Sequence, residues 1–207
     1  MRRATTADIP SIVDVYMDSF SEEIFSRQVY PRGVPSSTAY WTQAVREEME
    51  EPDAVWFVVT EPADTAIPDD DGNETVQGFL KWTRPGSPLP EPADSATAGL
   101  YPPEGEPAVA VAYYERIMAA HRERMAGTPH WYLDMMGVRR ACRRRGYARA
   151  MVAWGVGRAA QDGCPVYVDA TGDARGFYVR MGFATLGELR VVTPQGDAKI
   201  YLMLLKS

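Results

Sequence analysis

The sequence predicts an α/β domain built on a mixed β-sheet. In the first and middle parts of the chain, strand-like runs alternate with apolar stripes at helical spacing. Near the C-terminus, two strand-like runs follow one another as in a hairpin. A proline-rich segment separates the first strands from the run expected to form the central strand. Strands that alternate with helices and end in a hairpin are typical of an α/β fold with a mixed sheet.

Composition limits the class of protein. The chain has 207 residues, 45% of them hydrophobic, which suits one domain with an ordinary core. The formal net charge of −6 argues against a general nucleic-acid binder, because affinity for phosphate backbones needs basic surface. The arginines of residues 139–145 form a local exception. A nucleic-acid or nuclear-import role therefore stays open for that segment.

Cysteine usage and the N-terminus indicate the compartment. The two cysteines, Cys142 and Cys164, have neither a metal-type spacing nor a disulfide pattern. Residues 1–20 lack the apolar core of a signal peptide, and no apolar run approaches the ~18 residues that cross a bilayer. We therefore expect a soluble cytoplasmic protein without a metal and without a membrane as partner.

The N-terminal part is expected to supply helices to one side of the sheet. Residues 1–4 can form a short strand, and Thr5 or Thr6 can cap a helix that runs to Phe20. Residues 21–35 are less regular and are expected to wrap over the edge of the domain. A second helix is predicted for residues 37–50, because its apolar residues share one face and Pro52 follows it.

A hairpin and a long insertion come next. The predicted strands 54–60 and 75–83 are joined by an acidic loop, residues 61–73, in which Asp71-Gly72 is a turn signal. Residues 84–107 contain seven prolines, which exclude a helix or a central strand. A helix is predicted for residues 109–125, so that the insertion with its helix covers residues 84–127. The insertion is interpreted either as a flap over the substrate or as a mobile excursion.

The C-terminal half contains the remaining alternation of strands and helices. The predicted elements are a central strand 131–138, a helix 146–161, a strand 165–170, a short helix 173–181, and strands near 183–192 and 199–206.

The start of the helix at Gly146 has the properties of a phosphate site. Gly146 lets the backbone approach a ligand closely, and Ala148 keeps the first turn narrow. The free N–H groups at a helix start attract anions, and nearby guanidinium groups suit phosphate oxygens. The alternative is a solvated basic turn that only joins a strand to a helix. The arginines concerned are Arg139, Arg140, Arg143, Arg144 and Arg145.

Two segments resemble signatures of one family. The run Arg143-Arg144-Arg145-Gly146-Tyr147-Ala148 resembles the acyl-CoA signature of the GCN5-related N-acetyltransferases (GNAT). About thirty residues later, residues 171–183 resemble the second signature of this family, with an alanine, a Phe-Tyr pair and a Gly-Phe pair at matching positions. The resemblance covers nearly the whole chain. The insertion with its helix is similar to the larger members found in fungi.

The resemblance implies a fold and an activity. The fold is a GNAT-like mixed, mostly antiparallel central sheet of about seven strands flanked by helices, with the proline-rich insertion before the central strand. The whole chain, 1–207, is then a single acetyltransferase domain. The implied reaction moves an acetyl group from acetyl-CoA, used as co-substrate, to a primary amine of a small molecule or peptide within a ternary complex.

The resemblance also places the cofactor. Backbone N–H groups of residues 144–148 would hold the pyrophosphate, and the Val138 N–H would polarise the thioester carbonyl. Thr171 departs from the asparagine that usually contacts the pantetheine arm. The residues expected to bind acetyl-CoA are Met136, Gly137, Val138, Arg143, Arg144, Arg145, Gly146, Tyr147, Ala148, Thr171 and Tyr178.

Two side chains are candidates for proton transfer. Tyr178 matches the family tyrosine and could give a proton to the departing thiolate, although a packed core tyrosine is the alternative. Asp134 shares strand parity with Tyr132 and Met136 and could act as base from the acceptor cleft. A salt bridge explains Asp134 equally well. His121 is expected on a helix surface and His130 in a loop.

Other functions stay open at this point. One alternative is a catalytically silent acyl-CoA-binding or regulatory module on the same fold. Another is an adaptor that binds nucleic acid through residues 139–145. We expect an amine acceptor and no nucleic acid as partners, with a monomer or a homodimer as the assembly.

Overall fold

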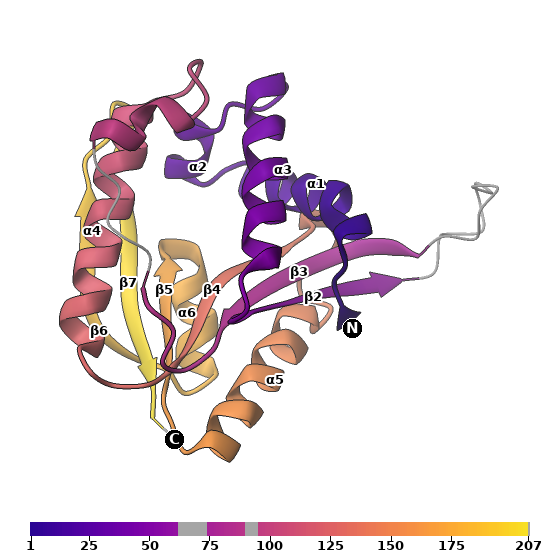
Figure 1. Cartoon of the computed structure of the whole chain (residues 1–207), viewed down its shortest axis with the longest axis vertical. Helices are drawn as coiled ribbons and strands as arrows, with labels where there is room; N and C mark the ends of the chain where they lie inside the picture. The colour runs from indigo at the N-terminus through magenta and orange to yellow at the C-terminus, as the bar shows by residue number, and fades with distance from the viewer. Residues whose placement is uncertain (62–73, 90–94, 207) are drawn as a thin grey trace.

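A single twisted sheet organises the protein (Figure 1). The computed structural model describes residues 1–61, 74–89 and 95–206, so the predicted Asp71-Gly72 turn lies outside the described residues. The sheet has seven strands in the order β1-β2-β3-β4-β5-β7-β6, which confirms the predicted fold class. The strands are β1 (Arg2–Arg3), β2 (Ala54–Glu61), β3 (Thr75–Thr83), β4 (Trp131–Val138), β5 (Val166–Thr171), β6 (Ala184–Val191) and β7 (Ala198–Leu205).

Helices cover both faces of this sheet (Figure 1). One face packs against α1, α2, α3 and α4, and the other packs against α5 and α6. The β2 strand shows why both faces are covered, since Trp56 and Val58 enter the first core while Val55 and Phe57 enter the second. The helices are α1 (Ile9–Ser19), α2 (Ile24–Val29), α3 (Pro35–Glu50), α4 (Pro107–Met125), α5 (Tyr147–Asp162) and α6 (Gly172–Arg180).

The sheet opens between its two parallel strands. Every other neighbouring pair of strands is antiparallel, and β4 pairs with β5 only at Trp131, Tyr132 and Leu133. Beyond Leu133, β4 stays paired with β3 as far as Val138, while its other edge is free of β5. A gap in the sheet therefore begins at the middle of β4, and it exposes backbone groups of the C-terminal half of this strand.

The N-terminal segments contain short elements that the sequence did not indicate. A 3₁₀ turn, Thr6–Asp8, precedes α1, so the predicted first helix consists of two pieces. The segment expected to be irregular contains α2, whose N-cap Glu23 accepts a hydrogen bond from the Ser26 N–H at 2.6 Å. A helix of six residues is too short to give a readable periodicity.

The described end of the insertion is part of the core. It contains a 3₁₀ helix, Ser95–Leu100, followed by Tyr101, whose buried ring stacks 5.4 Å from that of Tyr40. Gly105 lies directly against the backbone of Val29, where a side chain would overlap the Val29 carbonyl. Residues 101–106 are therefore packed against α2 and α3, which neither of the two interpretations of the insertion included.

The close contact between α5 and the sheet gives a test of the packing. A methyl group at Gly155 would overlap the buried Trp82 indole, whereas a methyl group at Gly157 would meet nothing within 4 Å. We expect Gly155→Ala to lower the free energy of unfolding by about 1–3 kcal/mol through overpacking. Gly157→Ala should raise it by about 0.5–1 kcal/mol because alanine favours the helix. Urea unfolding measures both, and equal stability of the two variants would contradict this packing.

Candidate active site

A cavity of about 530 Å³ lies beside the start of α5. Its walls come from the end of β4, the turn after it, the first turn of α5, and α6. The turn has unusual backbone geometry, with Arg144 at φ 63° and Gly146 at φ 90°. Glycine adopts this left-handed conformation at no steric cost. A Cβ at Gly146 would meet no protein atom within 4 Å, so the backbone here faces open space that a ligand can enter.

Backbone donors point into this cavity. The Ala150 N–H is the first of α5 bonded back to Gly146, which leaves the preceding N–H groups of the helix start available to an anion. The Arg139 N–H donates to the Gln77 carbonyl on β3 at 2.8 Å. Because successive N–H groups of a strand point to opposite sides, the Val138 N–H points away from β3 and into the gap. The residues present therefore fit a phosphate-bearing thioester.

The arginines of residues 139–145 serve different purposes. Arg139 Nε donates to the Val76 carbonyl, and the Arg140 guanidinium pairs with Glu22. Arg145 lies 3.5 Å from a Glu61 carboxylate oxygen and does not line the cavity. Only Arg143 and Arg144 of the five line it, where they offer positive charge to a phosphate. The basic run is thus divided between structural contacts and the cavity wall.

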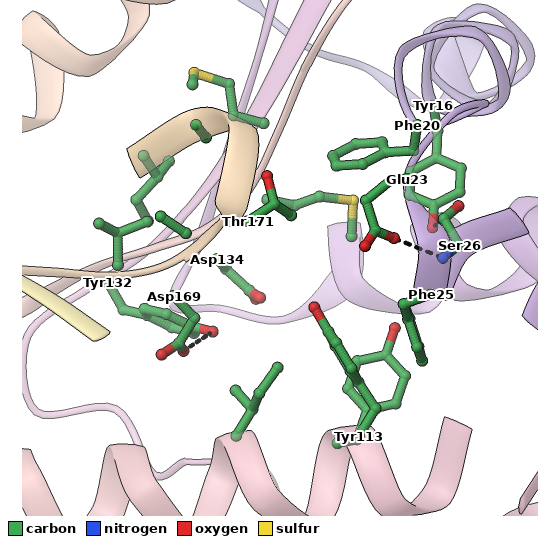
Figure 2. Close-up of a pocket in the computed structure, with 18 of the residues that line it drawn as sticks. Tyr16, Phe20, Glu23, Phe25, Ser26, Tyr113, Tyr132, Asp134, Asp169 and Thr171 are labelled. Carbon is green, nitrogen blue, oxygen red and sulfur yellow. Dashed lines mark hydrogen bonds between the residues drawn. The ribbon is translucent and has the colours of Figure 1, made fainter. Parts of the chain in front are cut away.

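A second, smaller cavity of about 200 Å³ lies in the gap of the sheet (Figure 2). Its walls are rich in aromatic rings from α1, α2 and α4, and three carboxylates face it, those of Glu23, Asp134 and Asp169. The two cavities have walls in common. The shared residues are Phe20, Glu23, Met136, Thr171 and Ala174.

Tyr178 lies at the smaller cavity. Its side chain is buried, and its ring packs 5.4 Å from that of Phe183 and 5.1 Å from that of Phe177. Burial raises the pKa of the Tyr178 hydroxyl, so the phenol keeps its proton at neutral pH. The residue lines the smaller cavity and not the larger one. Tyr178 thus packs in the core and also lines the smaller cavity.

Asp134 is held in a buried ion pair. Its carboxylate lies 2.8 Å from the Lys81 ammonium, which is also 2.8 Å from Glu48. Burial alone would lower the pKa of Lys81, but Asp134 and Glu48 outweigh this effect and raise it. Asp134 also lines the smaller cavity, so the salt bridge does not exclude the predicted role as base.

The strand parity predicted around Asp134 holds for Tyr132 and is wrong for Met136. Leu133 pairs with Trp82 and Met135 pairs with Lys81, so Asp134 is the extra residue of a β-bulge. The bulge shifts the alternation of side chains. Tyr132 consequently packs against the α4 side of the sheet, whereas Met136 packs with the core on the α5 side.

Glu23 is a site residue that the sequence did not indicate. It follows α1, caps α2 and lines both cavities, and Figure 2 shows its carboxylate among the side chains of the smaller one, hydrogen-bonded to the Ser26 N–H. Burial raises the pKa of Glu23 even though hydrogen bonds from the Ser26 and Phe25 backbone oppose this. A carboxylate with a raised pKa is a stronger base than an ordinary one.

The two histidines form a buried contact. Their Nε2 atoms are 2.7 Å apart, and burial lowers the pKa of His121 to about 3. His121 is fully buried beneath the rings of Tyr132 and Tyr167, so the expectation that it lies on the helix surface was wrong. His121 lies four residues after Ile117 and four before Met125, so it belongs to the buried face of α4.

Most of the residues predicted to bind acetyl-CoA line the larger cavity. Arg145 does not, and Tyr178 lies at the neighbouring cavity. The predicted residues that line the larger cavity are Met136, Gly137, Val138, Arg143, Arg144, Gly146, Tyr147, Ala148 and Thr171. Among the described residues, no helix is long and apolar enough to cross a membrane.

Comparison with known proteins identifies the family. A model of the Acetyltransferase (GNAT) family matches residues 41–183, more than half of the chain, and the chain belongs to this family. No curated protein matches it. A solved polyamine N-acetyltransferase from Drosophila melanogaster, which forms N-acetylagmatine, has a TM-score of 0.66 at 14% identity, with 100% of this chain and 98% of that chain covered.

Two bacterial structures are also similar, with somewhat lower TM-scores. A Corynebacterium glutamicum protein described as histone acetyltransferase and related acetyltransferase has a TM-score of 0.62 at 22% identity, with 99% of this chain and 94% of that chain covered. An N-acetyltransferase from Staphylococcus aureus has a TM-score of 0.56 at 15% identity, with 99% and 96% covered. These likenesses establish the fold.

Proposed function

We propose that the protein is an N-acetyltransferase that moves an acetyl group from acetyl-CoA to a primary amine. The observation that carries this proposal is the meeting of two cavities at the gap between β4 and β5. The larger cavity offers donors and arginines to phosphate, and the smaller one offers aromatic rings and carboxylates to an amine. Both substrates can be present together, which favours direct transfer within a ternary complex over a covalent acyl-enzyme.

Different groups of the protein would assist different steps of the reaction. Acetyl-CoA supplies an activated acyl carbon, which the amine nitrogen attacks as the new C–N bond forms. The Val138 N–H is placed to donate a hydrogen bond to the carbonyl oxygen as negative charge develops there, a contribution of about 3 kcal/mol. When the C–S bond breaks, the Tyr178 hydroxyl, from its position at the smaller cavity, would give its proton to the leaving thiolate.

The amine must also lose a proton. An alkylammonium has a pKa near ~10, so at neutral pH a base is needed before or during attack. We propose Glu23 for this step, because it lies on the shared wall and is not ion-paired to Lys81 as Asp134 is. The sequence predicted Asp134 as the base, and that prediction remains the alternative to Glu23.

Two conservative variants separate these bases. Glu23→Gln keeps the acceptor of the Ser26 N–H, and we expect it to lower turnover at pH 7 by about tenfold or more. In the wild type, turnover should fall as the pH drops through the raised pKa of Glu23, because its carboxylate becomes protonated. The glutamine variant should lack this inflection. Asp134→Asn serves as the comparison, and loss of the inflection in that variant instead would make Asp134 the base.

The reaction itself is tested with a panel of amines and detection of the free thiol. Release of CoA that depends on an amine, together with acetylated product by mass spectrometry, is the expected result. If acetyl-CoA binds and no amine releases thiol, the protein is the catalytically silent acyl-CoA-binding module instead.

A further inference from the structure

One wall of the smaller cavity carries a carboxylate that the proposed chemistry does not use. Asp169 lies on β5, two residues after Tyr167, and it faces the cavity across from Glu23 (Figure 2). The Tyr167 hydroxyl donates to Asp169 Oδ1 at 2.8 Å, and the Tyr132 hydroxyl donates to Oδ2 at 3.1 Å. These two hydrogen bonds fix the orientation of the carboxylate.

Among the described residues, the charge of Asp169 has no counterpart. In residues 1–61, 74–89 and 95–206, no lysine, arginine or histidine forms an ion pair with it, whereas Asp134 has Lys81. Burial raises the pKa of Asp169 to about 7 although both tyrosines oppose this, and the charge of Asp134 adds to the increase. A half-buried carboxylate with no opposite charge beside it is costly, and a bound cation would reduce that cost.

The surroundings of Asp169 suit an organic cation. The cavity wall contains the rings of Tyr132 and Tyr113, and the Tyr113 ring stacks 3.6 Å from that of Phe25. Aromatic faces attract ammonium and guanidinium groups, and they also cover an alkyl chain. The volume of about 200 Å³ is below the ~300–1,000 Å³ typical of ligand sites, which favours a short, slender molecule.

The positions of Glu23 and Asp169 indicate how an acceptor would be oriented in the smaller cavity. Glu23 lies on the wall shared with the larger cavity, whereas Asp169 lines the smaller cavity alone. An acceptor whose reacting amine lies at the shared wall would therefore extend toward Asp169. We propose that Asp169 is a cation subsite and that the preferred acceptor is a short amine carrying a second positive charge, an ammonium or a guanidinium. This inference rests on the proposed function, since it assigns the smaller cavity to the acceptor.

Two acceptors with the same number of non-hydrogen atoms test this proposal. Cadaverine and hexylamine differ only in a terminal ammonium in place of a methyl group. We expect the wild type to have a kcat/KM for cadaverine at least about tenfold above that for hexylamine, since hydrogen bonds to charged groups in partly buried sites are among the strong ones. Equal values, or a preference for hexylamine, would overturn the proposal with the wild type alone.

Substitutions test whether Asp169 causes the preference for cadaverine. Asp169→Asn keeps the size and removes the charge, so the ratio of the two kcat/KM values should fall by about tenfold. Glu115→Gln, which removes an exposed carboxylate from α4, is the control for general attraction of cations to an acidic protein, and it should keep the wild-type ratio. An unchanged ratio in Asp169→Asn would refute the subsite.

Binding separates this proposal from the proposed function. Calorimetric titration of cadaverine and hexylamine into the CoA-bound protein needs no turnover. If neither amine is acetylated but cadaverine binds more tightly, and this difference disappears in Asp169→Asn, the subsite stands while the proposed function fails. If Asp169→Asn does not fold, Tyr132→Phe replaces it. This variant removes a hydrogen bond that orients the carboxylate of Asp169 and lowers its pKa, so the preference for cadaverine should weaken, and an unchanged ratio would contradict the subsite.

Discussion

Gly146→Asp is expected to abolish the stabilisation that acetyl-CoA gives the protein. A ligand that binds only the folded state stabilises it by about 2.7 kcal/mol at roughly a hundred times its dissociation constant. Gly146 lies at the start of α5 with φ 90°, and a side chain there would project into the larger cavity. The added carboxylate would therefore repel the phosphates at the place where free N–H groups should receive them.

Gly146→Asn is the matched control for this experiment. Asparagine and aspartate have nearly the same size, and both tolerate left-handed backbone better than other side chains do. Thermal unfolding with and without acetyl-CoA should show a substantial shift for the asparagine variant and none for the aspartate variant. An acetyl-CoA shift of wild-type size in Gly146→Asp would show that the phosphates bind elsewhere.

Tyr178→Phe is expected to lower turnover by roughly 10²-fold, the lower end for general acid catalysis. The substitution removes one hydroxyl and keeps the ring, whose contacts with Phe177 and Phe183 are apolar. The raised pKa of Tyr178 means that the proton is present on the hydroxyl throughout the neutral range. Affinity for acetyl-CoA and thermal stability should therefore change little.

The measurement must be made where chemistry limits the rate. Single-turnover release of CoA, followed with a thiol reagent, satisfies this condition. Tyr147→Phe is a useful comparison, because it also removes a phenol hydroxyl, one that donates to Glu61. Wild-type turnover in Tyr178→Phe would make this tyrosine a packing residue.

The sequence predicted the sheet well, and it indicated most residues that line the larger cavity, because both signals are local. Every strand and long helix was recognisable from apolar periodicity and from glycine and proline at the boundaries. The larger cavity is formed mostly by two short runs, residues 136–149 and 171–180, so a motif could describe it. The order of strands within the sheet was not predicted, because periodicity does not show which strands pair.

The acceptor cavity was less predictable for physical reasons. The bulge at Asp134 changes which face each residue occupies, and a parity argument assumes a regular strand. Glu23 lies in a segment without periodicity. Asp169 is a lone acid in an apolar strand, as Asp134 is, so the sequence contained the same signal for both residues. His121 was misplaced although it lies four residues after Ile117, on the apolar face of α4.

The two cavities that meet at the gap between β4 and β5 differ in how their residues are distributed along the sequence. The residues that line the larger cavity lie mostly in two compact runs, whereas the smaller cavity is lined by side chains from α1, α2, α3, α4, β4 and β5. Substitutions on α2 or α4 can therefore reshape the space for the acceptor without altering the residues that face the phosphates. Such a division favours the evolution of new acceptors on an unchanged donor site. Mutant libraries restricted to Phe25, Tyr113 and Asp169 should be an economical way to redirect this enzyme.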